Sequence, residues 1–224
     1  MEHKLLKDIF LLSLHVSKKK KVYVTNSMMN YSLIGAILYE MLAENSITFI
    51  QKKVVLNAEA KNIDPLFIPF YKTIQKARNK RIKMLTSRMI NHTYSLRKVL
   101  FEDLEKRGIV VRTRHRFLWV FPYTSRYMTN TAYRDSLVND LKSVLFSDKK
   151  LDFYEASLFS LIKASKLEKV LTKDKQQLKA IKKQIESKVK ASEISKDIQL
   201  AFNEMQAALT IIMISSAVAV SSSR

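Results

Sequence analysis

Three arginines spaced two residues apart, Arg112, Arg114 and Arg116, have a pattern that indicates phosphate binding. In a β-strand, side chains at every second position point to the same face. A guanidinium group can bind two oxygens of one phosphate at the same time. If this segment is a strand, the three side chains form a row of phosphate-binding groups.

Three aromatic residues follow the arginines at odd positions: Phe117, Trp119 and Phe121. Strand geometry places them on the face opposite to the arginines, provided that no bulge shifts the register. On that face they pack against their own domain or against a second copy of the chain, while the arginines stay outward. The alternative is exposure, and an exposed Trp119 suits a membrane interface because its ring is apolar with one polar edge.

The positive charge of the chain is large and unevenly placed. Forty Lys and Arg stand against 20 Asp and Glu, which gives a formal net charge of +20. No acidic residue occurs over 65–101 or over 106–134, and the first of these windows contains Lys80 and Arg81. A charge of this size is usually offset by an anionic partner: a lipid surface, a nucleic acid or an acidic protein. The alternative interpretation is a set of helix faces that only contact water.

Residue patterns that support catalysis or metal binding are missing. The chain has no Cys, which excludes disulfides, thiol chemistry and thiolate metal ligands. Its 2 Gly cannot form a glycine-rich phosphate loop. The histidines His3, His15, His92 and His115 have no second His or carboxylate at ligand spacing. We therefore predict a binding protein without cofactor or metal, rather than an enzyme.

Helices are expected to position most of these residues, because 2 Gly and 3 Pro in 224 residues leave few turns. Apolar periodicity predicts a mainly α, single domain over 1–224, with helices over 5–14, 28–44, 66–107 with breaks, 131–146, 152–165, 168–190 and 193–220. Helices 28–44 and 196–220 are apolar around most of their circumference, so we expect them at the centre of a buried bundle.

Two short β-hairpins are also predicted, over 47–56 and 109–121. The second is expected to turn near residues 113–115 and to end before Pro122. The longest apolar tract, 207–220, is shorter than the roughly 20 residues that a membrane span needs. We interpret this tract as a buried helix.

A repeated helix-and-hairpin pattern leaves a second function open. The segment 38–42 before the first hairpin matches the segment 100–104 before the second. A helix followed by a β-wing is typical of winged-helix nucleic-acid-binding proteins, in which a helix enters the major groove. However, the helix over 27–44 has no Lys or Arg, and the helix over 93–107 contains three acidic residues. Nucleic-acid binding is therefore the weaker alternative.

The order of these elements resembles the Golgi phosphoprotein 3 family, including its short, bacterial-type members. The segment Gly35-Ala36-x-Leu38-x-Glu40-Met41-Leu42 is similar to the family's Gly-x-x-Leu-x-Glu-Leu helix. Leu104–Val110 resembles its Leu-x-x-(Lys/Arg)-Gly-Val-Leu segment. Leu11–Leu14 and the charged, then aromatic, run Arg116–Phe121 also match in place and character.

The resemblance implies a helical domain with a central bundle, a basic face that binds phosphatidylinositol 4-phosphate, and a hairpin used in oligomerisation. For eukaryotic members it also implies a peripheral Golgi adaptor that binds cytosolic tails of glycosyltransferases. Of the family's headgroup positions, this chain retains an arginine at Arg97. A Trp of the family is replaced by Thr25, and two further Arg are replaced by Ile34 and Tyr94.

We therefore expect a cytoplasmic protein that lies peripherally on a membrane and contacts anionic phospholipid or phosphoinositide headgroups. Homo-oligomers and cytosolic tails of membrane proteins are further expected partners. One electropositive surface is expected to gather the lipid-binding residues, with the last two as secondary members: Arg97, Arg112, Arg114, Arg116, Lys80 and Arg81.

Overall fold

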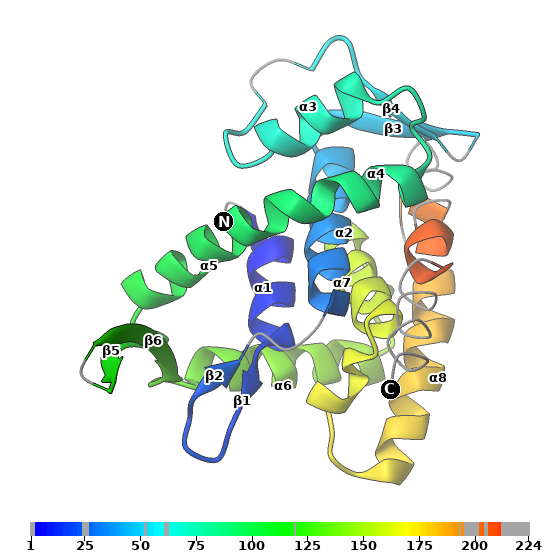
Figure 1. The fold of residues 1–224 in the computed structure, drawn as a ribbon. Helices are drawn as coiled ribbons and strands as arrows, with labels where there is room; N and C mark the ends of the chain where they lie inside the picture. The colour runs from blue at the N-terminus through cyan, green and yellow to red at the C-terminus, as the bar shows by residue number, and fades with distance from the viewer. Residues whose placement is uncertain are drawn as a thin grey trace, which may run out of the picture.

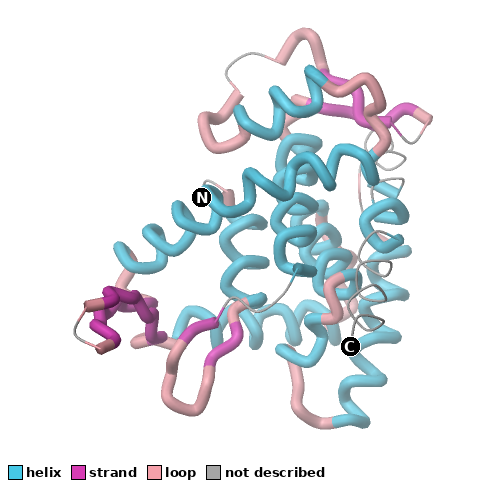
Figure 2. Tube along the Cα trace, in the orientation of Figure 1, coloured by secondary structure: helices cyan, strands magenta, loops and turns pink. Residues whose placement is uncertain are grey.

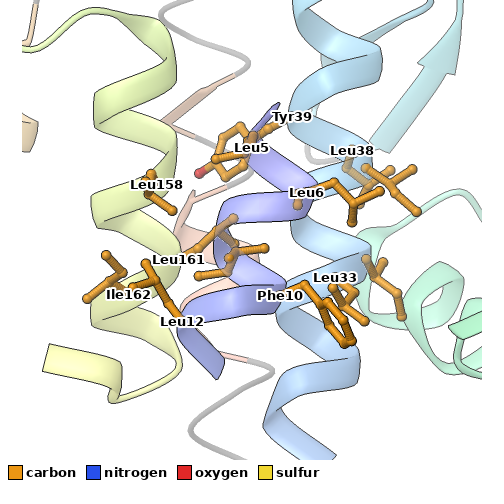
Figure 3. Close-up of a cluster of buried hydrophobic side chains, with 14 of the residues drawn as sticks. Leu5, Leu6, Phe10, Leu12, Leu33, Leu38, Tyr39, Leu158, Leu161 and Ile162 are labelled. Atoms are coloured by element: carbon orange, nitrogen blue, oxygen red, sulfur yellow. The ribbon is translucent and has the colours of Figure 1, made fainter. Parts of the chain in front are cut away.

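Helix α2, Ser27–Ala43, is the centre of the fold. The computed structural model describes residues 3–23, 27–51, 53–60, 63–118, 120–192, 194, 202–203 and 206–211. Helix α2 lies beside α1 (Lys4–Ser13) and α7 (Phe153–Ala164), and the apolar side chains of the three helices interlock (Figures 1 and 3). Ile37 is fully buried, as expected for a helix that is apolar on all sides. The predicted mainly α fold is confirmed.

A nearly continuous helical rod crosses this centre. It consists of α4 (Ile82–Met89), the short 3-10 helix η1 (Ile90–His92) and α5 (Thr93–Lys106), as Figure 1 shows. Helix α3 (Ile68–Lys76) precedes the rod and packs on the first hairpin. The rod ends at Gly108, whose φ of 67° is the left-handed conformation that glycine adopts after a helix.

Helices α6 (Ala132–Phe146) and α8 (Lys175–Lys190) pack against each other on the other side of the bundle. The single helix predicted over 168–190 is wrong, because the chain forms the 3-10 helix η2 (Leu167–Val170) and then starts α8 anew. Asp174 causes this new start: its side chain accepts a hydrogen bond from the backbone N–H of Gln177 at 2.7 Å.

The helix predicted over 193–220 lies mostly outside the described residues. Residues 202–203 and 206–211 are helical, and Phe202 and Leu209 are buried. For the rest of this segment, its central position stays a prediction.

Short antiparallel hairpins extend from the helices (Figure 2). The pair β3 (Ile47–Ile50) and β4 (Lys53–Leu56) confirms the first predicted hairpin. The pair β5 (Val110–Phe117) and β6 (Phe121–Met128) is longer than predicted. A third pair, β1 (His15–Val16) and β2 (Val22–Tyr23), was not predicted, and Lys21 bridges from it to Tyr127 of β6.

The turn of the β5–β6 hairpin lies at residues 118–120, not near residues 113–115. Pro122 does not end the hairpin but pairs with Arg116 inside it. Proline is tolerated there because a two-stranded ribbon has outer edges that require no backbone N–H donor. All three arginines of the row therefore lie in one strand. Within the described ranges, no helix is long and apolar enough to cross a bilayer.

Candidate functional site

The β5–β6 hairpin has two chemically different faces. Its register pairs Val110 with Met128, and both side chains are buried at the base of the hairpin next to α5. Because side chains alternate along a strand, the row Arg112, Arg114 and Arg116 continues on the face of Val110. The predicted alternation of the arginines is confirmed, and their side chains are exposed.

The first arginine of the row is engaged by a carboxylate of α5. Glu105 lies between the strands' paired arginines: its Oε1 accepts a hydrogen bond from Arg126 Nε at 2.9 Å, and its Oε2 lies 3.5 Å from Arg112 Nε. The Arg126 guanidinium also lies 4.3 Å from the ring centre of Phe101. These contacts fix the base of the hairpin to the rod and partly neutralise Arg112.

The other two arginines of the row lie further out along the hairpin. Among the described residues, neither Arg114 nor Arg116 has a carboxylate within salt-bridge distance. Their partners across the ribbon are Thr124 and Pro122, which carry no charge. Their positive charge is therefore directed into solvent.

The tip of the hairpin is apolar and exposed. Leu118 is 67 %, Val120 71 % and Phe121 64 % accessible to solvent. Of the two predicted environments for Phe121, its own domain does not cover the ring, and packing against a second copy of the chain stays a prediction. The hairpin lies at the end of α5 (Figure 1). Trp119 and the side chain of Phe117 lie outside the described residues.

The face opposite to the arginines is aromatic. His115 stacks on Tyr123 with ring centres 4.9 Å apart and meets the edge of Tyr127 at 6.4 Å. Sequence reasoning missed the two tyrosines because the turn was placed too early, so β6 was not recognised as a strand. The signal that indicates β6 is the alternation of side chains over 121–128, which extends the strand pattern beyond Pro122.

The remaining predicted lipid-binding residues do not join this hairpin in one cluster. Lys80 and Arg81 precede α4, and Arg81 bridges to Lys53 of β4. Helical rise of about 1.5 Å per residue gives the rod over 82–106 a length of roughly 37 Å. Lys80 and Arg81 therefore lie at the opposite end of the rod from the hairpin. Arg97 lies part-way along it, half-buried, with its guanidinium 5.9 Å from the ring centre of Tyr94.

A family model for Golgi phosphoprotein 3 (GPP34) matches residues 5–205, which include the bundle, the rod and the β5–β6 hairpin. The chain belongs to the Golgi phosphoprotein 3 family. A comparison with curated proteins finds no match. Two positions that the sequence resemblance aligned with headgroup arginines differ in their exposure in this Golgi phosphoprotein 3 domain. Ile34 is fully buried, whereas Tyr94 is exposed. Thr25 lies outside the described residues.

The described part of this Golgi phosphoprotein 3 domain contains no group of three or more potential metal ligands. Several of its ionisable side chains form pairs that join elements. Examples are Lys7 of α1 with Asp103 of α5, and Lys163 of α7 with Glu186 of α8, each at 3.3 Å. Two arginines of the hairpin, Arg114 and Arg116, face solvent instead, and they do so next to the exposed apolar side chains Leu118, Val120 and Phe121.

Proposed function

We propose that this protein is a peripheral membrane-binding module, not an enzyme, and that the β5–β6 hairpin contacts the lipid. One observation carries the proposal: the exposed apolar tip, Leu118, Val120 and Phe121, directly adjoins Arg114 and Arg116, which have no carboxylate partner in the described part of the chain. Apolar side chains at a tip can enter the interfacial region of a bilayer, while adjoining cations bind anionic headgroups. Each cation near such a surface contributes roughly 1 kcal/mol before screening.

The same observation makes nucleic acid the weaker alternative. Contacts with a phosphate backbone use cations and polar groups, and they leave no role for three neighbouring exposed apolar side chains. An exposed apolar patch bordered by polar groups is typical of a membrane or protein interaction site.

We propose that the protein binds anionic lipid surfaces in general. Phosphatidylinositol 4-phosphate is included among these lipids because the chain belongs to the Golgi phosphoprotein 3 family. Arg97 supports a headgroup contact near the middle of the rod, where Tyr94 is exposed. Ile34 offers no such contact, since it is buried and apolar. By the same family membership, we propose cytosolic tails of membrane proteins as further partners, on the cytoplasmic side of a membrane.

Self-association through the hairpin is a second proposed role. Within the described residues, β5 is paired only with β6, so its outer edge has free backbone donors and acceptors. An edge of this kind can pair with another strand. The exposed rings of Phe121 and Tyr123 on the partner strand β6 add apolar surface to the same hairpin.

Vesicle co-sedimentation tests the lipid proposal, with neutral vesicles, vesicles containing phosphatidylserine and vesicles containing phosphatidylinositol 4-phosphate. We expect binding to both anionic vesicles and little to neutral ones. The double variant Arg114→Glu with Arg116→Glu should reduce binding roughly tenfold or more. Leu118→Ser with Val120→Ser should also reduce it, because the tip no longer inserts.

The matched control is Lys80→Glu with Arg81→Glu, which changes the net charge by the same amount at the far end of the rod. It should retain most of the binding. Equal losses in the two charge-reversal variants would contradict the hairpin as the membrane contact and would favour attraction by overall charge. Competition by duplex DNA that removes all vesicle binding would favour the nucleic-acid alternative.

A further inference from the structure

A cavity of about 970 Å³ lies at the end of the bundle where α1 leads into β1. Its wall is formed by the start of α2, by α6 and by the segment from η2 to the start of α8. This volume is in the range of pockets that bind small organic molecules. None of the hairpin residues discussed above lines it.

The inner wall of the cavity is apolar. Half-buried apolar side chains form the accessible part of this wall: Val16, Val138, Leu167 and Val170. The almost fully buried Leu12, Leu14, Met29 and Leu171 lie beneath them. These side chains come from separate segments and surround one space. Such a lining favours a ligand with a hydrocarbon part.

A guanidinium group lies in the wall of this apolar space. Arg134 donates a hydrogen bond from Nη2 to the backbone O of Leu14 at 3.3 Å. Its Nε is buried and has no hydrogen-bond partner in the part of the chain that the structure describes. Burial lowers the pKa of Arg134 from its usual value, but a guanidinium stays charged near neutral pH. The residue as a whole is half-buried, and the charge of Asp135 acts on it. The buried Nε of Arg134 still lacks an acceptor among the described residues. A buried charged donor of this kind is costly to leave unpaired, so a ligand with an anionic acceptor fits beside it.

Cations outnumber carboxylates among the lining residues. Lys142, Lys169 and Lys173 join Arg134 there, and none of the three lysines has a carboxylate within salt-bridge distance among the described residues. The lining carboxylates are Asp135 and Asp174. Asp174 already accepts the backbone N–H of Gln177 as the cap of α8. The local potential is therefore positive.

We propose that this cavity binds a single-chain anionic amphiphile, with its hydrocarbon chain against the apolar wall and its carboxylate or phosphate on Arg134. The lysines draw the headgroup to the site, and Arg134 holds it. An apolar ligand without charge leaves the guanidinium unpaired, and a free inorganic anion leaves the apolar wall in contact with water. The site holds one molecule, in contrast to the hairpin, which contacts a lipid surface.

Fluorescence titration with dansylaminoundecanoic acid, a fatty acid that brightens in apolar surroundings, tests the proposal on the full chain. We expect saturable binding, and much weaker binding of its methyl ester. Arg134→Met should weaken binding about tenfold or more, since it removes a charged hydrogen-bond donor and retains an apolar stem. Val138→Trp should weaken it independently, because the indole fills the cavity from α6.

Circular dichroism and thermal melting establish that each variant is folded. The matched controls are Arg116→Met, which removes an arginine from the hairpin, and Leu118→Ser with Val120→Ser, which removes the other exposed apolar surface. Both controls should bind the probe like the wild type. If they lose the probe instead, or if folded Arg134→Met and Val138→Trp both bind normally, the proposal is overturned.

Competitors distinguish the possible sources of the anion. Displacement by oleate or by lysophosphatidate supports the amphiphile and shows which headgroup is preferred. Displacement by inorganic phosphate at similar concentrations would overturn the assignment to an amphiphile, because it would show that the anion alone is recognised.

Discussion

At the scale of single residues, the buried carboxylate of Asp8 joins three helices. It accepts hydrogen bonds from Lys4 Nζ of α1 at 2.7 Å, from Tyr133 of α6 at 3.0 Å and from Tyr154 of α7 at 2.5 Å. Burial, and after it the negative charge of Asp8, raises the pKa of the Tyr154 phenol above its usual value. Burial also raises the pKa of Tyr39 in α2. These phenols therefore hold their protons more tightly in the folded state than in the unfolded state.

This raised pKa predicts a loss of stability at alkaline pH. The contribution of Tyr154 is fully present below the pKa of an unfolded tyrosine, about 10, and falls as pH rises above it, because only the unfolded state then releases the proton. We expect the difference in unfolding free energy between wild type and Tyr154→Phe to be constant near neutral pH and to shrink above about pH 10. Urea unfolding of both proteins measures this difference, and the comparison cancels the titration of lysines that do not contact Tyr154, which Lys4 does. A constant difference up to about pH 11 would contradict this linkage.

The arginine row shows what local spacing can and cannot predict. Strand parity correctly placed Arg112, Arg114 and Arg116 on one face, because parity depends only on the backbone. Spacing did not reveal that Glu105 engages Arg112, since that contact depends on how α5 and β5 pack. Nor did parity show the exposure of Phe121, which depends on how far the hairpin projects.

At the scale of elements, helices were predicted well where apolar residues recur and less well where a cap divides them. The bounds of α2 and α7 follow the apolar periodicity closely. The boundary between η2 and α8 depends on a single capping side chain, Asp174, inside a run with continuous helical character. The turn of the β5–β6 hairpin was misplaced because Pro122 was interpreted as an end, although edge strands tolerate proline.

A lysine from α8 closes the end of α6. Lys188 Nζ donates hydrogen bonds to the backbone O of Val144 at 2.8 Å, of Ser147 at 2.5 Å and of Lys149 at 2.7 Å. Carbonyl groups at a helix C-terminus have no partners within the helix and carry partial negative charge. One ammonium group therefore satisfies several acceptors and fixes α6 to α8.

We expect Lys188→Met to lower the free energy of unfolding by about 1–3 kcal/mol, the range for losing a charged hydrogen-bond donor. Chemical denaturation measures this value. Lys182→Met is the matched control, because Lys182 lies exposed on the same helix and should change stability by less than about 0.5 kcal/mol. Equal effects of the two substitutions would show that the capping bonds do not contribute to stability.

At the scale of the whole molecule, the sequence did not predict sites that are formed by segments far apart in the chain. The cavity is lined by side chains from Leu12 to Asp174, and no local pattern joins them. The lipid-binding candidates were predicted to converge because they share two acid-free windows. The rod separates Lys80 and Arg81 from the hairpin, because a continuous helix carries the chain away along its axis.

The net charge of +20 predicts opposite effects of salt on the two proposed roles of the hairpin. Binding to anionic vesicles depends on attraction, which salt screens over roughly 10 Å at 0.1 M. Self-association brings two equally charged chains together, so the same screening reduces repulsion and favours the oligomer. Raising the salt concentration from about 0.05 M to about 0.5 M should therefore weaken vesicle binding and increase the fraction of dimer.

Co-sedimentation with phosphatidylserine vesicles and sedimentation velocity over a concentration series measure these two quantities on the same preparation. Leu118→Ser with Val120→Ser serves as the control, because it leaves the net charge unchanged and removes the apolar contact that both roles share. In that variant vesicle binding and dimer formation should both be reduced at every salt concentration. A wild-type protein that stays monomeric at high protein concentration and high salt would exclude the oligomer. Because repulsion is screened under that condition, the only remaining role of the hairpin tip would then be contact with lipid.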